Sequence, residues 1–250
     1  MRFISWLITK QQTKAKFLKR VHRMKKLQEI SEAYSLAALL TLSGGFMDAY
    51  SYICRDQVFA NAQTGNMLLF GINLSTGNIS SALRYLFPVM AFAFGIAVTE
   101  IIRNLSSNKN LLHWRQIILA AEAVILLSVA FMPQSLNLLA NSLISFACGF
   151  QVQSFQKVNG SGIATTMCIG NLRAAVQATC EYGFSKNKIA KESGFLYFSI
   201  IGIFIIGAIL GNFCVGMWQE RAIVVSVVLL LAGFLFMHIK RVDRNKQMDE

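Results

Sequence analysis

Long, nearly unbroken apolar segments restrict the fold of this chain more than any other feature of its sequence. They recur along its length as Leu36–Leu42, Val89–Val98, Ile117–Met132, Phe195–Leu210 and Ala222–Met237. Apolar residues fill these segments instead of forming one stripe, and about 20 such residues cross the hydrocarbon of a bilayer. Backbone groups in lipid must be bonded within the protein, and a helix achieves this within one segment. The sequence therefore predicts an all-α, polytopic membrane protein.

The composition argues against a soluble enzyme. Hydrophobic residues make up 54% of the 250 residues and charged residues only 14%, whereas soluble domains carry about 25% charged residues. The five cysteines form no CxxC pair, no HExxH zinc motif occurs, and no Walker-type phosphate loop is present. We therefore predict no catalytic residues, no metal and no cofactor, and we do not expect enzyme activity.

Positive charge is concentrated at the amino terminus of the chain. The first 30 residues hold nine Lys or Arg and one acid, within a formal net charge of +12. We predict that residues 1–30 form a basic amphipathic arm at the cytoplasmic surface, which contacts anionic lipid. A merely solvated basic tail is the alternative, and nucleic-acid binding is not expected. Residues 31–240 would form the transmembrane domain and residues 241–250 a cytoplasmic tail.

Six strong spans are predicted at about 33–53, 84–102, 113–132, 135–155, 194–214 and 221–239. Two further segments, Gln57–Leu74 and Gly160–Thr179, are long enough to cross but contain many polar residues. Either they are polar-lined spans, which gives eight crossings, or they are broken or re-entrant helices beside six crossings. Lys and Arg favour the cytoplasmic side. Six crossings keep the loop that contains Arg103 and Lys109 inside, with both termini, so we favour six.

The two polar segments occupy matching places in two halves, at about 33–132 and 135–239. In the first half Gly45-Phe46 precedes Gly65-Asn66, and in the second Gly149-Phe150 precedes Gly170-Asn171 at nearly the same spacing. Three crossings per half require the second half to be inverted. Inverted repeats with interrupted helices at matching positions are typical of transporters and channels. The sequence therefore predicts an inverted internal repeat.

Two motifs in the first half indicate a family. Residues 43–50 read SGGFMDAY and residues 58–66 read VFANAQTGN. This pair resembles the YoaK-like family of bacterial inner-membrane proteins, which combines a GGxxDA motif with an FxxxQTGN motif and repeats a weaker pattern later in the chain. Here the later copy has Ile169 before Gly170 instead of threonine. The resemblance covers most of residues 33–240. It implies a multi-pass protein of the bacterial cytoplasmic membrane, and it implies no substrate.

Asp48 is the first candidate for a functional residue because a carboxylate inside a membrane span costs roughly 3 kcal/mol or more. We predict a proton or cation site there, and the alternative is an acid at a helix end that reaches the outer interface. If Gly65 breaks a helix near the bilayer centre, exposed amides and carbonyls around it can hold a solute. Packing by small residues and interhelical hydrogen bonds is the alternative. The predicted substrate-binding residues are Asp48, Asn61, Gln63, Thr64, Gly65, Asn66, Thr165, Thr166, Gly170 and Asn171.

Two other acids lie in apolar surroundings. We predict that Glu122 forms a hydrogen bond between helices or pairs with Arg84 or Arg115, and that Glu100 pairs with Arg103. The leading interpretation of the whole sequence is a secondary transporter or channel-like protein for a small polar or ionic solute. The alternative is a non-transporting scaffold or regulatory protein whose basic arm binds lipid. The sequence indicates neither the solute nor the oligomeric state.

Overall fold

The computed structural model describes residues 34–106, 111–158 and 161–249, and the predicted basic arm lies outside these residues. In this part of the chain the structure is helical, apart from a short antiparallel pair of strands. The elements are α2 (Tyr34–Cys54), α3 (Gln63–Ser75), α4 (Ile79–Ser106), α5 (Leu111–Val129), η1 (Gln134–Leu136), α6 (Asn137–Ser154), β1 (Lys157–Val158), β2 (Ser161–Gly162), α7 (Ile169–Ser185), α8 (Lys188–Trp218), η2 (Gln219–Ile223) and α9 (Val224–Asp249).

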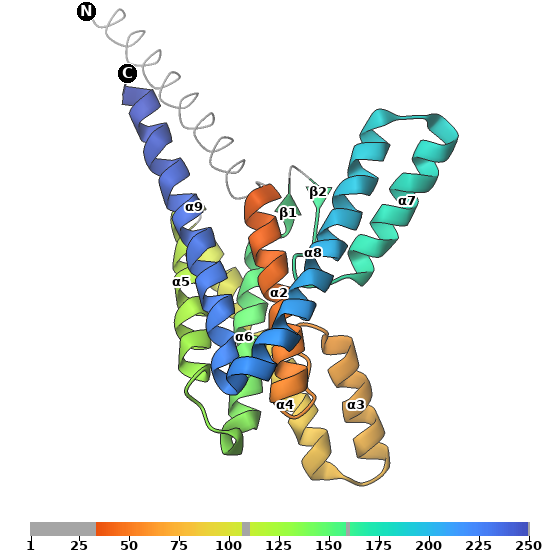
Figure 1. Ribbon diagram of the computed structural model, residues 1–250, viewed down its shortest axis with the longest axis vertical. Helices are drawn as coiled ribbons and strands as arrows, with labels where there is room; N and C mark the ends of the chain where they lie inside the picture. The colour runs from red at the N-terminus through yellow and green to blue at the C-terminus, as the bar shows by residue number, and fades with distance from the viewer. Residues whose placement is uncertain (1–33, 107–110, 159–160, 250) are drawn as a thin grey trace, which may run out of the picture.

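Helices α2, α5, α6 and α9 form the core of the molecule (Figure 1). Their facing surfaces bury apolar side chains that are at most 1% exposed, among them Leu36, Phe46, Leu119, Ile144 and Leu230. Helix α8 packs along α2, and α4 packs along α6. Each predicted span coincides for most of its length with one α-helix, and the α-helical fold class is confirmed.

Glycines set the two closest helix crossings. A Cβ added to Gly45 of α2 would lie 2.0 Å from the Phe204 carbonyl oxygen of α8, and one added to Gly207 would lie 2.2 Å from the Leu42 oxygen. The α4–α6 crossing has the same close backbone approach at glycine. A Cβ added to Gly95 would lie 2.3 Å, and one added to Gly149 2.4 Å, from a carbonyl oxygen of the facing helix. Lipid supplies no hydrophobic force between helices, so this close backbone approach is a main source of their association.

Helices α3 and α7 stand apart from the core and pair with α4 and α8 (Figure 1). The two hairpins extend from opposite ends of the molecule. Helix α3 has 13 residues, which makes it about 20 Å long at 1.5 Å per residue and shorter than the roughly 30 Å hydrocarbon core. Each of these helices follows a non-helical segment that runs back into the protein.

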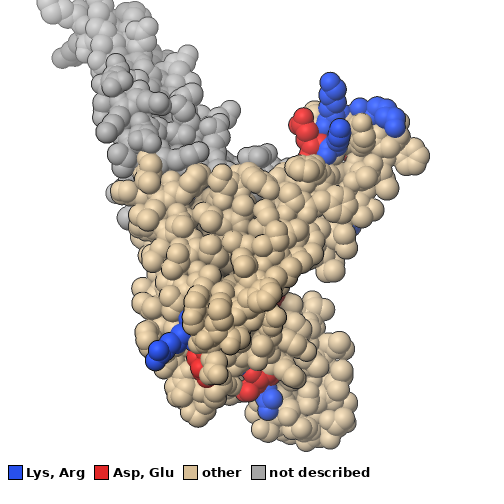
Figure 2. Space-filling view, in the orientation of Figure 1, with Lys and Arg blue, Asp and Glu red and all other residues tan. Residues whose placement is uncertain are grey.

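The surface of the helices is that of a membrane protein. Three stretches of the described residues are long and apolar enough to cross a bilayer: Ile79–Ser106, Gln134–Ser154 and Lys188–Ile239. The last stretch contains α8 and most of α9, which η2 separates. Figure 2 shows charged side chains gathered near the two ends of the visible face, with an uncharged band between them. An uncharged band of this kind suits a lipid environment.

The short strand pair, the end of α9 and the ion pair on α4 can each be compared with the expectations from the sequence. The strands β1 and β2 are an addition to the predicted all-α fold, and they form where the chain turns back between α6 and α7. Helix α9 continues through Asp249, so the segment predicted as a separate tail prolongs the last helix. The predicted ion pair between Glu100 and Arg103 is confirmed one turn apart on α4.

Candidate functional site

The two polar segments meet α2 and α8 around a cavity of about 1010 Å³. Its walls come from the second half of α2, the start of α3 with the residues before it, the start of α7 with the residues before it, and one face of α8. Asp48, Asn61, Gln63 and Thr64 contribute polar groups from the first half of the chain, and Thr166 and Asn212 contribute them from the second. The fold therefore brings both predicted motifs to one place.

Asp48 holds the first segment against α2. The backbone N–H of Asn61 donates to Asp48 Oδ1 at 2.7 Å, and the Asn61 side-chain amide donates to the carbonyl oxygen of Gly44 at 3.1 Å. Gly44 lies at the middle of α2, whereas the segment leaves α2 at its end, at Cys54. The chain therefore turns back by half the length of α2 before α3 begins. Asp48 is only 9% exposed, so its side chain is largely enclosed by the protein.

Two asparagines close the turns before α3 and α7 in the same way. Asn66 accepts from the Phe59 N–H at 3.0 Å and donates to the Phe59 carbonyl oxygen at 2.8 Å. Asn171 accepts from the Ala164 N–H at 3.3 Å and donates to the Ala164 oxygen at 2.7 Å. Each asparagine thereby satisfies both backbone groups of the residue seven positions earlier, as an inserted strand would.

The second segment reaches α2 from the other side. A Cβ added to Gly44 would lie 3.0 Å from the Thr165 carbonyl oxygen and 3.4 Å from the Thr166 Cα. Gln151 of α6 donates to the Leu40 carbonyl oxygen at 3.0 Å and to Thr165 Oγ1 at 3.3 Å, which ties this segment to α2 and α6. Gly44 is thus the point at which both segments contact the same helix.

The predicted site residues divide into two groups. Six of them line the cavity: Asp48, Asn61, Gln63, Thr64, Thr166 and Gly170. The other four, Gly65, Asn66, Thr165 and Asn171, are not among the residues that line it. Asn66 and Asn171 are at most 2% exposed, because their amides are used to hold the turns. The structure therefore gives the asparagines of the two Gly-Asn pairs a positioning role.

The helix break considered at Gly65 does not occur there, because Gly65 lies within α3. Helix α3 begins at Gln63, and among the described glycines only Gly77 has a positive φ. The break lies earlier, in the segment after Cys54, where the chain has left the helical conformation. Gly65 serves packing instead, because a Cβ there would lie 2.8 Å from the Phe59 ring. Gly170 has no atom within 4 Å of such a Cβ, so the two glycines are not equivalent.

Several cavity residues were not predicted from the sequence. Tyr52 and Phe59 stack with ring centroids 4.8 Å apart and an interplanar angle of 23°, and both line the cavity together with Phe204 and Phe213 of α8. Aromatic residues in an apolar span carry no local signal that separates a cavity wall from a lipid contact. Only the position of α8 against α2 reveals them.

Arg55 is a second residue whose role the sequence did not indicate. Although it is charged, its side chain is 0% exposed. Its guanidinium donates to the Val129 and Met132 carbonyl oxygens at 3.1 and 2.9 Å, to Asn137 Oδ1 at 3.0 Å and to the Tyr50 hydroxyl at 3.0 Å. The last carbonyls of a helix have no partner within the helix. Arg55 satisfies those at the end of α5 and joins α5 and α6 to α2.

Glu122 is fully buried in α5, and neither of its carboxylate oxygens has a hydrogen-bond partner among the described residues. The predicted interhelical hydrogen bond of Glu122 is therefore not formed within this part of the chain. Leu119, Ala123 and Leu126 on the same helix belong to the apolar core, which explains why no polar group reaches it. The Cys148 thiol of α6 lies within electrostatic range of both Glu122 and Asp48.

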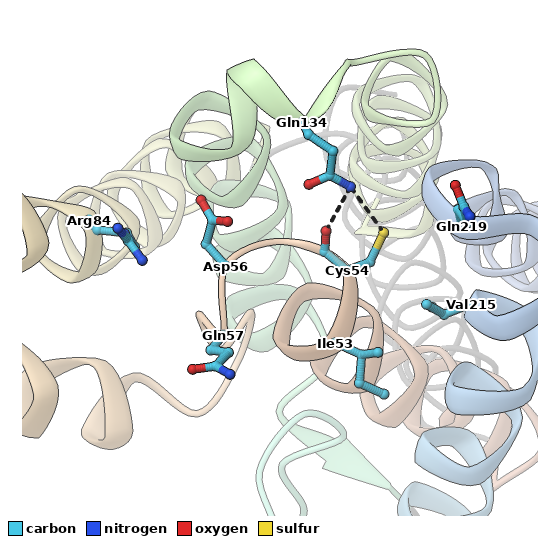
Figure 3. A pocket seen from close by; sticks show the side chains of 8 residues that line it. All are labelled: Ile53, Cys54, Asp56, Gln57, Arg84, Gln134, Val215 and Gln219. Carbon is cyan, nitrogen blue, oxygen red and sulfur yellow. Dashed lines mark hydrogen bonds between the residues drawn. The ribbon is translucent and has the colours of Figure 1, made fainter.

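A second, more polar hollow of about 530 Å³ lies at the end of α2. Figure 3 shows Arg84 reaching from α4 toward the turn that carries Asp56 and Gln57. These two residues have φ values of 60° and 58°, a left-handed conformation that reverses the chain after α2. Gln134 closes the other side by donating to the Cys54 carbonyl oxygen at 3.1 Å. The charges here have both signs, since Arg84 and Asp56 both line the hollow.

The described residues offer no metal site, since no group of three or more His, Cys, Asp or Glu side chains lies together in them. Cys54, Cys148, Cys168, Cys180 and Cys214 are free thiols. The chemistry available at the cavity is therefore that of one carboxylate, a few amides and hydroxyls, and aromatic rings. Sites for small molecules are commonly built from a set of this kind.

Comparison with known proteins agrees with this architecture. Residues 36–236 match the model of a family described as "Protein of unknown function (DUF1275)". The chain belongs to the DUF1275 family. The matched region includes both polar segments and every helix from α2 onward, except for the ends of α2 and α9.

A curated relative is the UPF0700 transmembrane protein YoaK of Bacillus subtilis (strain 168), which is 25% identical over 153 residues. The alignment covers 57% of this chain and 65% of the relative, slightly less than two thirds of its length. No solved structure matches this DUF1275 protein. The resemblance to a YoaK-like family is thus confirmed, and the protein is a membrane protein of that family.

Proposed function

We propose that this protein is a secondary transporter, or a channel-like protein, that moves a small polar or ionic solute across the bacterial cytoplasmic membrane. The observation that carries the proposal is the meeting of Asp48 and both polar segments around one cavity of about 1010 Å³. Sites for small molecules are concave, mostly apolar, and contain a few placed polar groups. A cavity built where two interrupted helices converge is the arrangement that transporters use for their solute.

An inverted repeat of α2–α5 and α6–α9 supports this proposal. The Asn66 and Asn171 turns have the same hydrogen bonds. The glycine crossings pair α2 with α8 and α4 with α6, which are exchanged when the two halves are exchanged. The α3–α4 and α7–α8 hairpins also extend from opposite ends of the molecule in Figure 1. A two-fold axis in the membrane plane has these properties.

We favour six crossings with α3 and α7 as re-entrant helices. The turn before α3 reaches the middle of α2, and α3 is too short to cross on its own. The cytoplasmic face would be the end that carries the α7–α8 connection and the end of α9, which both lie toward the top of Figure 1, on opposite sides. Lys186, Lys188 and Lys191 lie at that connection, as expected for a cytoplasmic loop. Both termini would then be cytoplasmic, and the basic arm would contact anionic lipid.

The transport proposal excludes an enzymatic role and competes with a non-transporting scaffold that uses only the lipid-binding arm. A scaffold needs the fold but not the cavity. The distinguishing variant is therefore Ala62→Phe, because Ala62 is exposed and lines the cavity. Ala93→Phe is the matched control, since Ala93 is exposed on α4 and is not among the residues that line the cavity.

The experiment has two steps. Purified protein is first screened by thermal shift against a library of small polar and ionic solutes, because a bound solute stabilises the folded state. Solutes that raise the melting temperature are then tested for uptake into proteoliposomes with an imposed proton gradient. We expect uptake by the wild type and by Ala93→Phe, and loss of uptake in Ala62→Phe. Uptake that is equal in both variants, or the absence of any stabilising solute, would overturn the proposal and favour the scaffold.

A further inference from the structure

The walls of the cavity around Asp48 are mainly apolar and aromatic. Tyr52 and Phe59 supply a stacked pair of rings, and Phe204 and Phe213 of α8 supply two more. Aromatic faces carry negative electrostatic potential and attract cations within about 6 Å of the ring centroid. The volume of about 1010 Å³ is at the upper end of the range of about 300–1,000 Å³ for small-molecule sites. The cavity therefore suits a bulky, partly apolar ligand.

Among the described residues, Asp48 is the only carboxylate that lines this cavity, and no Lys, Arg or His of this part of the chain lines it. No ion pair of Asp48 is formed among the described residues, where the one salt bridge joins Glu100 to Arg103. Arg55, the closest basic residue in sequence, is directed at carbonyl oxygens, an amide and a hydroxyl instead. The carboxylate thus faces the cavity without a cation supplied by this part of the chain.

The Asn61 N–H donates to Asp48, but the negative charge still lies in a low-dielectric interior, where a group that neutralises it is favourable. Either a proton or a bound cation can do so, and the two exclude each other. We propose that the cavity binds a monovalent organic cation with apolar or aromatic groups, and that this cation and a proton compete for Asp48. This inference rests on the proposed function. The solute class is then a lipophilic ammonium or phosphonium ion, exchanged for a proton.

The other titratable groups near Asp48 are few. The Cys148 thiol on α6 and the Cys168 thiol before α7 are within electrostatic range of Asp48, and Glu122 on α5 acts on Cys148. Tyr52 lies one turn beyond Asp48 on α2 and lines the same cavity. Helices α3 and α8 contribute no titratable side chain to the lining. Glu122 is the one other carboxylate of this set, and it is not among the residues that line the cavity.

The test uses two probes of matched shape and opposite charge, tetraphenylphosphonium and tetraphenylborate. Binding to the purified full-length protein in detergent is measured by calorimetry at about pH 6 and about pH 8. We expect the phosphonium to bind and the borate not to bind. Affinity for the phosphonium should fall as the pH falls, by at most about tenfold per pH unit for a one-for-one exchange with a proton.

Two pairs of variants locate the site. Asp48→Asn should weaken phosphonium binding by at least about tenfold and remove its pH dependence, whereas Glu192→Gln, which removes an exposed acid of α8, should not change it. If Asp48→Asn does not fold, Phe213→Ala decides the question. Phe213 lines the cavity, and its loss should weaken binding relative to Phe198→Ala, an exposed phenylalanine of the same helix that is not among the lining residues.

Three results would overturn the inference. The first is equal binding of the borate. The second is full phosphonium affinity in a folded Asp48→Asn protein or, if that variant does not fold, in Phe213→Ala. The third is a wild-type cavity that binds neither probe because detergent or phospholipid occupies it. If the phosphonium fails while another solute is taken up in a manner that Ala62→Phe blocks, the transport proposal stands and the cation inference alone is wrong. If the phosphonium does not bind and no other solute is taken up, both the cation inference and the transport proposal are wrong.

Discussion

Replacement of Gly45 by alanine tests the helix packing on which the cavity depends. Gly45 lies on α2, directly against the backbone of α8, which forms one wall of the cavity. The new Cβ would lie 2.0 Å from the Phe204 carbonyl oxygen, 2.9 Å from its carbon and 3.1 Å from the Ala208 nitrogen. All three atoms belong to the backbone, so no side chain can rotate away. The two helices must separate.

The size of the effect follows from that separation. Ordinary contact begins at about 3.4 Å, so α2 and α8 must move apart by roughly 1.4 Å at this crossing. Overpacking of a well-packed interior costs typically about 1–3 kcal/mol, and a rigid backbone obstacle places Gly45→Ala at the upper end. Alanine gains about 1 kcal/mol over glycine in a helix. We expect a net loss of about 2 kcal/mol in the free energy of unfolding.

The assay is reversible unfolding of the purified protein in mixed micelles, followed by the melting temperature and by circular dichroism. Gly202→Ala is the matched control on the same helix pair, because no atom lies within 4 Å of a Cβ added to Gly202 of α8. It should leave stability unchanged or raise it by up to about 1 kcal/mol. A Gly45→Ala protein as stable as Gly202→Ala would show that α2 and α8 do not cross as described, and the reasoning would fail.

Four further changes have expected outcomes. Asn66→Ala removes the bonds that hold the first turn and should lower stability by about 2 kcal/mol, measured by chemical unfolding. Arg55→Met leaves buried carbonyls without donors and should cost about 3 kcal/mol or more, seen as a lower melting temperature. Lys186→Gly relieves a left-handed residue (φ 55°) at the end of α7 and should raise stability by about 0.5–1 kcal/mol in calorimetry. Single cysteines at Gln134 and Lys188, in a background without native cysteines, should be labelled from outside and from the cytoplasm respectively, and the reverse would refute the topology.

Arg55 and Glu122 show how similar sequence signals lead to different structural roles. Both are ionisable residues in apolar surroundings, and both are fully buried. Arg55 reaches carbonyl oxygens that a helix end leaves free, whereas Glu122 lies in the middle of α5, where every nearby backbone group is already bonded within the helix. The sequence shows that each of the two side chains is charged. Whether such a side chain finds a hydrogen-bond partner depends on whether the fold places the end of another helix beside it.

The sequence by itself determined the helical membrane fold and the polar residues of the candidate site. Hydropathy is a local property, and a bilayer requires helices wherever a long apolar segment crosses it. The same reasoning singled out Asp48, because a carboxylate inside an apolar membrane segment has a high free-energy cost. The two polar segments were recognised for the same reason, since their amides and hydroxyls interrupt an otherwise apolar pattern.

Only the tertiary structure decided which of these groups meet and what surrounds them. Lipid is as apolar as the protein core, so the apolar face of a membrane helix does not reveal its neighbours. The sequence therefore could not indicate that α8 lies against α2, that Phe204 and Phe213 join Asp48 in one cavity, or that Asn66 closes a turn. Those contacts join residues far apart in the chain. They follow from close backbone approach at Gly45 and Gly207, which depends on the shape of two helices together.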